Sequence, residues 1–135
     1  MLLRRVGLAA AALVAVGGLA SCRPGPAVSV SPNTGLVDRQ EVTVRGTGYA
    51  PGGSVGILQC RAGATSIDRC DGRTADSFSA DASGAYTRRM TVYAVVEDAH
   101  GVTTDCTAAP GACIVASVYV HGFQGLATAP LTFAP

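Results

Sequence analysis

The sequence predicts an all-β fold, an antiparallel β-sandwich, and two observations support this prediction. From residue 27 onward, short segments rich in Val and Thr alternate with clusters of Gly, Pro, Asn and Asp, and such clusters favour turns between strands. No part of this region repeats its apolar residues with the period of a helix. About seven or eight short strands separated by turns are typical of a sandwich.

Eight segments are predicted as strands because each is rich in β-branched or aromatic residues. In chain order they are residues 27–31, 41–45, 54–60, 76–80, 85–96, 102–106, 113–120 and 129–133. In the second segment, Val42 and Val44 alternate with polar residues, as in a half-buried strand. In the seventh, alternate apolar residues from Ile114 to Val120 share one face, which we expect to point into the sandwich. Turn sequences lie at 32–35, 51–53, 82–84 and 110–111.

The composition is that of one globular domain. The chain has 135 residues, of which 48% are hydrophobic and 14% are charged, and this balance excludes a disordered chain. All ten basic residues are arginines, they face nine acidic residues, and the formal net charge is +1. Because nucleic-acid binding by phosphate neutralisation needs a clear excess of basic residues, we expect no direct nucleic-acid binding.

The first 22 residues have the layout of a bacterial lipoprotein signal. Arg4 and Arg5 precede an apolar run, which ends in Leu-Ala-Ser-Cys at 19–22, a sequence that resembles a lipobox. A lipobox cysteine receives a diacylglyceryl group, and two acyl chains anchor a protein stably to a membrane. The expected organisation is a signal peptide at 1–21, lipidated Cys22 with a short Pro/Gly tether at 22–26, and a folded domain at 27–135.

This organisation predicts an exported domain on the extracellular face of the cell membrane; the alternative is an ordinary signal peptide in which Cys22 is incidental. Export places the other four cysteines, Cys60, Cys70, Cys106 and Cys113, where disulfides persist. Four cysteines allow three pairings. The simplest pairing closes the two short loops. A bridge between the sheets, of the immunoglobulin kind, is the alternative, although that architecture usually stacks a Trp on its disulfide and this chain has none.

Catalytic and metal-binding patterns are weak in this sequence. The two histidines, His100 and His121, do not have the spacing of metal ligands, and we expect no metal. Asp98 and His100 with Ser83 or Ser117 would form a hydrolytic triad only if the fold brought them together, and no nucleophile-elbow motif is present. We expect no enzyme.

Several arginines could form a basic surface, but the pattern favours a mixed-charge one. Arg88 and Arg89 are neighbours on a predicted strand, so their side chains point to opposite faces. Arg61, Arg69 and Arg73 alternate with acidic residues in the sequence. We therefore expect a solvated surface of mixed charge rather than a nucleic-acid site.

A small-molecule cleft is the binding site that the sequence favours. Ligand clefts are mostly apolar with a few placed polar groups. Candidate apolar lining residues close to the first cysteine pair are Ala62, Ile67, Val95, Val96, Ile114 and Val118. Candidate polar groups are Gln59, Asp68, Glu97 and Ser117. The alternative is that these apolar side chains belong to the core of the sandwich.

Several motifs, in order along most of the chain, resemble the neocarzinostatin family. The spacing of nine residues between Cys60 and Cys70 is part of this resemblance. The other matching sequences are VSVSPNTGL at 28–36, VTVRG at 42–46, QC at 59–60, DSFSADASG at 76–84, TV at 91–92, TDCT at 104–107, AC at 112–113 and LTF at 131–133.

The resemblance implies a seven-stranded, immunoglobulin-like Greek-key sandwich with disulfides Cys60–Cys70 and Cys106–Cys113, the first in the floor or wall of a cleft. It also implies a secreted actinobacterial apoprotein that holds an enediyne chromophore non-covalently. DNA-binding and antibacterial roles are likewise implied for this chain by the resemblance alone. Ala62 stands where a carrier places a large aromatic residue, and Ile114 where the family is often polar. The predicted function is a monomeric, membrane-anchored lipoprotein that binds a small hydrophobic molecule, with no other cofactor. The alternative is a cell-envelope interaction protein that has lost its ligand.

Overall fold

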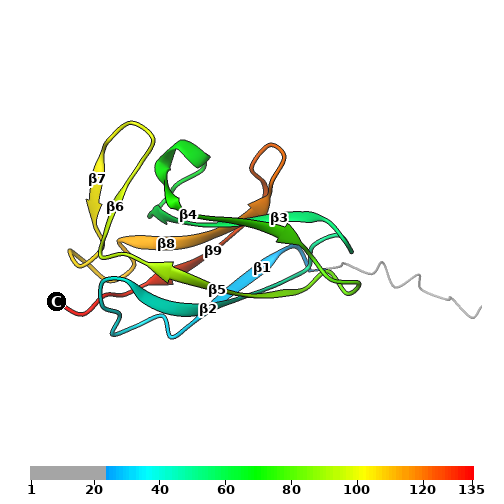
Figure 1. Ribbon diagram of the computed structural model, residues 1–135, viewed down its shortest axis with the longest axis horizontal. Coiled ribbons are helices and arrows are strands. Elements are labelled where there is room, and N and C mark those ends of the chain that lie inside the picture. The colour runs from blue at the N-terminus through cyan, green and yellow to red at the C-terminus, as the bar shows by residue number, and fades with distance from the viewer. Residues whose placement is uncertain (1–23) are drawn as a thin grey trace, which may run out of the picture.

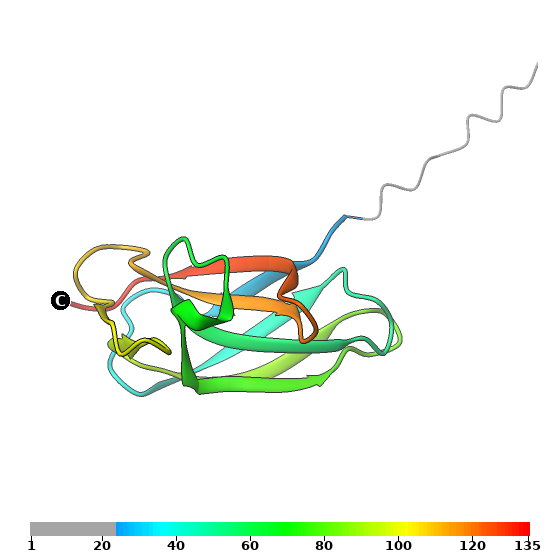
Figure 2. The ribbon, with the colours of Figure 1, turned by 90° about the horizontal axis from the view of Figure 1, so that it is seen from above.

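The computed structural model describes residues 24–135, which fold into two packed antiparallel sheets (Figures 1 and 2). The predicted signal peptide and lipidated Cys22 lie outside the described residues. One sheet has the strand order β1-β2-β5 and the other β4-β3-β8-β9, while β6 and β7 form a separate ribbon. No helix within residues 24–135 is long and apolar enough to cross a membrane.

The strands account for most of the domain. The three-stranded sheet contains β1 (Ala27–Ser31), β2 (Gln40–Thr47) and β5 (Tyr86–Val92). The four-stranded sheet contains β3 (Ser54–Arg61), β4 (Cys70–Ser79), β8 (Cys113–Tyr119) and β9 (Gln124–Leu131). The ribbon contains β6 (Val95–Glu97) and β7 (Thr103–Asp105), and η1 (Ile67–Arg69) is a single 3-10 turn between β3 and β4. The all-β sandwich is confirmed, with seven strands in its two sheets and two more in the ribbon.

The main core lies between the two sheets, where alternate residues of each strand meet. Val42 and Val44 of β2 point inward from one sheet, and Val55 and Ile57 of β3 and Val115 of β8 point inward from the other. All five are at most 2% exposed. Burying an aliphatic side chain of this size stabilises a fold by roughly 1.5–3 kcal/mol, so this layer holds the sandwich together.

Three predicted strands differ from the observed ones. The predicted strand 85–96 is broken at Tyr93 and Ala94, where the chain leaves the sandwich and enters the ribbon. β4 begins at Cys70, six residues before the predicted start, because its polar first half was not distinguishable from a loop. β9 begins at Gln124, five residues before the predicted start, and ends at Leu131, so that it includes Pro130. A proline is tolerated there because β9 is an edge strand.

The structure pairs Cys60 with Cys70 and Cys106 with Cys113, as the family resemblance implies. Neither bridge joins the two sheets: the first connects β3 to β4 within one sheet, and the second joins the segment after β7 to β8. The immunoglobulin-type bridge therefore does not occur. Both disulfides close short loops at the end of the sandwich that also bears η1 and the ribbon (Figure 1).

Candidate ligand-binding cleft

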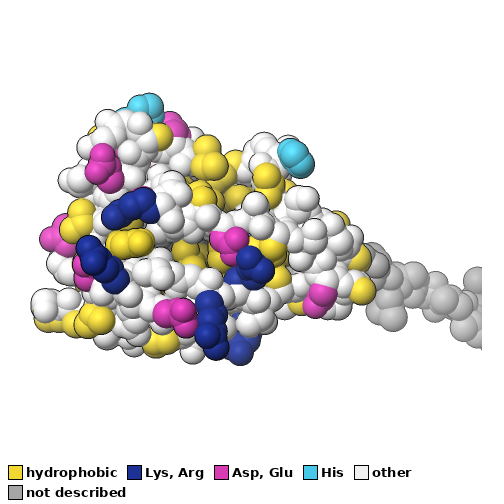
Figure 3. Space-filling view, in the orientation of Figure 1, with side chains coloured by type: hydrophobic (Ala, Val, Ile, Leu, Met, Phe, Trp, Pro, Cys, Tyr) yellow, Lys and Arg dark blue, Asp and Glu magenta, His cyan; other side chains and the backbone are white. Residues whose placement is uncertain are grey.

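The outer face of the four-stranded sheet, turned away from the three-stranded sheet, carries an open apolar cleft of about 520 Å³. Three segments project from this side of the sheet: the η1 loop, the loop between β8 and β9, and the β6–β7 ribbon (Figure 1). Hydrophobic side chains gather in the hollow between them (Figure 3). The residues that line the cleft are Gly56, Leu58, Thr65, Ser66, Ile67, Ala75, Asp76, Ser77, Val118, Val120, Gly122 and Phe123.

The floor of the cleft consists of alternate residues of β3 and β8. Leu58 of β3 and Val118 of β8 are only 4% and 3% exposed, and they belong to a second apolar cluster that is separate from the main core. That cluster also contains the Cys60–Cys70 disulfide and Ile114. The alternate residues Ile114, Ala116 and Val118, which we expected to point into the sandwich, therefore lie on the outer face of the sheet, and that expectation is wrong.

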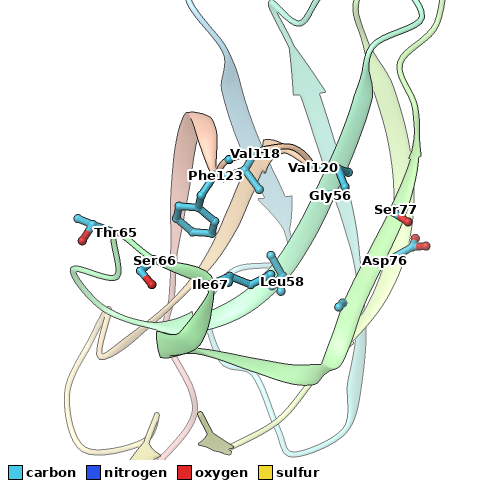
Figure 4. A pocket seen from close by; sticks show the side chains of 12 residues that line it. Gly56, Leu58, Thr65, Ser66, Ile67, Asp76, Ser77, Val118, Val120 and Phe123 are labelled. Carbon is cyan, nitrogen blue, oxygen red and sulfur yellow. The ribbon is translucent and has the colours of Figure 1, made fainter. Parts of the chain in front are cut away.

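The walls of the cleft come from two loops. Ile67 of η1 is 61% exposed, and Phe123 of the β8–β9 loop is half-buried. Figure 4 shows both side chains directed toward the space above Leu58 and Val118. Among the residues that line the cleft, Phe123 supplies the aromatic ring. Large exposed apolar side chains beside an apolar floor are typical of a ligand site.

The polar groups at the rim leave the cleft without an unpaired charge. Asp76 is the charged residue among the lining residues, and its carboxylate accepts hydrogen bonds from the Arg88 guanidinium at 2.9 and 3.1 Å. The other polar lining residues, Thr65, Ser66 and Ser77, bear hydroxyls. An apolar floor with neutral hydrogen-bonding groups at its edge suits the uncharged body of a small molecule.

The η1 wall is fixed to the ribbon through Asp68 and His100. The Asp68 carboxylate lies 3.0 Å from His100 Nε2, and the Asp68 carbonyl accepts a hydrogen bond from the Ala99 N–H at 3.1 Å. The hydrogen bond from His100 lowers the pKa of Asp68. Asp68, which we expected among the polar ligand contacts, instead holds the loop that carries Ile67.

Gln59 does not reach the cleft. Its side chain is fully buried on the inner side of β3, where the amide Nε2 donates to the Tyr93 carbonyl at 2.7 Å and Oε1 accepts from the Tyr93 N–H at 2.8 Å. The side chain thus pairs with the backbone at the point where β5 ends and the ribbon begins. Gln59 is an anchor for the ribbon.

Asp71 gives the ribbon a second anchor and explains the position of Glu97. Its buried carboxylate accepts the Glu97 N–H at 3.0 Å and forms a bidentate pair with Arg73, whose Nε donates to Oδ1 and whose Nη2 donates to Oδ2. The Arg73 guanidinium also stacks on the Tyr93 ring, 4.1 Å from its centroid. Burial alone would raise the pKa of Asp71, but the hydrogen bonds from Arg73 and from the Glu97 and Arg73 backbone N–H groups lower it. The Glu97 side chain is exposed and does not line the cleft, while Val96 lies in the main core.

Ser117 also points into the sandwich. Its hydroxyl is buried and bonds to Tyr49 Oη at 2.6 Å and to the hydroxyl of Tyr86. Burial raises the pKa of Tyr86 to about 12, against the lowering effect of the Ser117 hydrogen bond. The role of Ser117 is to satisfy two tyrosine hydroxyls in the core, so it is not available to a ligand in the cleft.

The two remaining predicted residues lie on other surfaces. Val95 lines a small hollow together with Asp38, Arg39 and Arg73, and Ala62 lines a polar hollow beside the η1 loop. The structure thus brings Ile67 and Val118 of the predicted set to the cleft, with Ile114 in the cluster beneath it.

Sequence reasoning missed several lining residues. Leu58 was detectable in principle, because Gly56, Leu58 and Cys60 alternate with the inward residues of β3. Phe123 was not, because it lies in a loop with a φ of 53° and its position depends on how that loop folds back over the sheet.

The catalytic and metal alternatives find no geometric support in residues 24–135. No three His, Cys, Asp or Glu side chains among them are placed to hold a metal ion. His100 contacts Asp68 rather than a serine. Ser83 bonds to Asp81 at 2.6 Å, and Ser117 is occupied by the two tyrosines. The hypothetical triad is therefore not assembled.

Comparison with known proteins identifies the family. The family model described as "Neocarzinostatin family" matches residues 28–133. The chain belongs to the neocarzinostatin family. This confirms the resemblance seen in the sequence motifs, and the match includes every residue that lines the cleft.

Curated relatives in the family come from actinomycetes. Macromomycin of Streptomyces macromomyceticus is 35% identical over 67% of this chain and 66% of its own length. The antitumor antibiotic C-1027 apoprotein of Streptomyces globisporus is 42% identical over 60% of this chain and 57% of its own length. The chain thus spans less than two thirds of the length of these two relatives.

The solved structures agree with the sandwich. Macromomycin has a TM-score of 0.69 at 30% identity, covering 82% of this chain and 100% of that one. The solution structure of apokedarcidin has a TM-score of 0.57 at 31% identity, covering 82% of this chain and 99% of that one. The neocarzinostatin-like fold is therefore shared over nearly the whole described domain.

Proposed function

We propose that this chain is a non-enzymatic carrier protein whose outer-face cleft holds a small apolar molecule by non-covalent contacts. The observation that carries the proposal is the cleft itself, an open hollow with Leu58 and Val118 in its floor and Phe123 and the exposed Ile67 in its walls. Its volume of about 520 Å³ lies within the range of small-molecule sites, roughly 300–1,000 Å³. Membership of a family that includes an antibiotic apoprotein supports the same role.

The lining favours a ligand whose apolar body is aliphatic, alicyclic or a small aromatic rather than a large polycyclic system. A polycyclic ligand stacked on both of its faces needs aromatic side chains on both sides, and the lining residues offer Phe123 alone. Ile67, Leu58 and Val118 provide branched aliphatic contacts instead. An enediyne cargo, which the family resemblance implies, would thus be held here mainly by aliphatic contacts, with aromatic stacking from Phe123 alone.

We also propose that the carrier is attached to the extracellular face of the membrane through lipidated Cys22. The lipobox sequence at 19–22 supports this, and a short tether would keep the cleft close to the membrane surface. Sequestration of a reactive compound at the cell surface would suit such an anchor. Mass spectrometry of the membrane fraction should find a diacylated N-terminal peptide beginning at Cys22. A soluble product with an unmodified Cys22 would contradict the anchor without affecting the cleft.

The cleft is tested by isolating the full chain from an exporting Streptomyces host. Native mass spectrometry should show a reproducible adduct, and organic extraction should release one small apolar molecule. Ile67→Asp, which places a charge on the cleft wall, should abolish the adduct. Val37→Asp is the matched control, because Val37 is similarly exposed, at 58%, and lies outside the cleft.

An adduct that persists in Ile67→Asp, or one that is lost in Val37→Asp as well, would contradict the proposed site. The interaction protein without a ligand would instead show a clean apo mass in every variant and a co-purifying protein. That alternative predicts a closed cleft, and the open cleft described above favours the carrier.

A further inference from the structure

A second hollow, of about 440 Å³, meets the cleft at Thr65, which lines both. It lies beside the η1 loop and differs from the cleft in chemistry. Arg61, the last residue of β3, and Arg69, the last residue of η1, both line it. We call it the arginine hollow.

Among residues 24–135, no carboxylate forms an ion pair with the two guanidinium groups of the arginine hollow. Residues 24–135 contain seven arginines, and four of them form ion pairs with acidic residues: Arg39, Arg73, Arg88 and Arg89. Of the three arginines without an ion pair in this part of the chain, two line this one hollow and the third, Arg45, lies on β2. Two cations around one hollow repel each other unless an anion lies between them.

The rest of the lining suits an anion. Ala62, Gly63, Ala64 and Ala112 are small and leave the hollow open for close approach, and Thr65 and Thr104 contribute hydroxyl donors. Both arginine side chains belong to half-buried residues, so part of their freedom is already restricted. A guanidinium offers a planar set of N–H donors that matches the oxygens of a carboxylate or sulfonate.

The neighbouring acidic residues do not fill this role. Asp98 accepts hydrogen bonds from the His100 and Val102 N–H groups at 2.8 and 3.0 Å, and Asp68 is bonded to the His100 ring. Neither carboxylate forms an ion pair with Arg61 or Arg69, and neither lines the arginine hollow. They reduce the local positive potential but leave the guanidinium donors available.

We propose that the ligand of this protein is an amphipathic anion, whose apolar body lies in the cleft and whose anionic oxygen group lies between Arg61 and Arg69. The inference rests on the proposed carrier function and narrows its ligand class. Thr65 is the point where such a molecule would pass from the cleft to the hollow. A neutral molecule of the same apolar shape would fill the cleft and leave the two arginines unpaired.

A matched pair of fluorescent probes tests the proposal on the full chain. Anilinonaphthalene sulfonate and N-phenylnaphthylamine share an aromatic amine body, and the first carries a sulfonate. The wild-type protein should bind the sulfonate about tenfold more tightly, the size expected of one or two charge-assisted hydrogen bonds at a solvated site. Added NaCl should reduce that preference and leave the neutral probe unaffected.

The variant Arg61→Gln plus Arg69→Gln should remove the preference, so that both probes bind with the affinity of the neutral one. Arg45→Gln is the control, since Arg45 is exposed and has no ion pair among the described residues. If the double variant keeps the preference, or if Arg45→Gln removes it, the anion site is wrong while the carrier function stands. If neither probe binds the wild-type protein, the proposed function fails, and this inference fails with it.

Inorganic sulfate separates an amphipathic ligand from a free anion. Sulfate has no apolar body, so it should compete with the sulfonate probe only at concentrations at least about tenfold above those of the probe. Competition at equal concentrations would show an independent anion site and would overturn the amphipathic ligand.

Discussion

The two faces of the four-stranded sheet are built from neighbouring residues of the same strands, but they are covered in different ways. On β3, Ile57 points inward and is closed off by the three-stranded sheet, whereas the next residue, Leu58, points outward to the floor of the cleft. Both are nearly fully buried, at 0% and 4% exposure. On the inner face, burial closes the core and stabilises the fold. On the outer face, it leaves Leu58 in the floor of the cleft that we propose as the ligand site.

The comparison predicts that truncating each neighbour will affect stability to a different degree. Ile57→Ala should lower the free energy of unfolding by roughly 2–5 kcal/mol, because it leaves a closed cavity between two sheets. Leu58→Ala should cost about 2 kcal/mol, at the lower end of that range, because the space it leaves joins the open cleft and mainly the transfer free energy is lost. Urea unfolding of both variants measures the difference. Equal costs would mean that the two faces are equally closed.

The ribbon anchor should come next in size. Gln59→Leu removes two hydrogen bonds to Tyr93 and leaves a partly buried backbone N–H and carbonyl unpaired, at a cost of about 2–3 kcal/mol. Hydrogen exchange should accelerate in β6 and β7 before it does in β3 and β8. Gln124→Leu, at an exposed position of β9, should leave the free energy of unfolding and the hydrogen exchange of the ribbon unchanged. Unaltered exchange of the ribbon in Gln59→Leu would show that it is held by other contacts.

Asp71 should make stability depend on pH in the acid range. Its pKa is lower in the folded state than in the unfolded chain, so its contribution is complete above the unfolded value of about 4 and is lost as the pH falls through the folded value. Asp71→Asn should lower the free energy of unfolding by about 1–2 kcal/mol at neutral pH. Below a pH of about 4, this free energy should fall less steeply in the variant than in the wild type. Parallel curves of unfolding free energy against pH for the two proteins would exclude Asp71 as the source of the pH dependence.

The smallest effect is expected at the wall of the cleft. His100→Gln removes the ring contact with Asp68, and because both side chains are exposed the unfolding midpoint should not change measurably. Exchange of the Ala99 amide, which donates to the Asp68 carbonyl, should rise by about threefold as the loop contact opens more often. His121→Gln on the β8–β9 loop is the control. A change in midpoint would show that the loop contact belongs to the cooperative fold.

The same two faces explain which features the sequence could predict. Val42 and Val44 alternate with polar residues, so the inward face of β2 could be predicted from the sequence. β8 is buried from Cys113 to Val118, and a strand that is apolar on both faces has no periodicity to say which face meets the other sheet. The sequence therefore supported both an inward and a cleft-facing position for Ile114 and Val118, and the structure places both on the outer face of the sheet.

Polar residues were harder to assign, because their partners lie far away in the sequence. Gln59 and Ser117 read as ligand contacts, but their partners are Tyr93 and the pair Tyr49 and Tyr86, between 31 and 68 residues away. Phe123 enters the cleft through the fold of a loop. Such long-range partners depend on the packing of the two sheets, which composition and spacing do not encode.

The most direct test of the carrier function is to map where an apolar probe binds by NMR chemical-shift perturbation. The full chain should be titrated with N-phenylnaphthylamine while backbone amides and methyl groups are followed. Shifts should concentrate at Leu58, Ile67, Val118 and Phe123 and leave Ile57 and Val115 unperturbed. Shifts confined to another surface, or saturation without any shift at these four residues, would contradict the assignment of the outer face as the ligand-binding cleft.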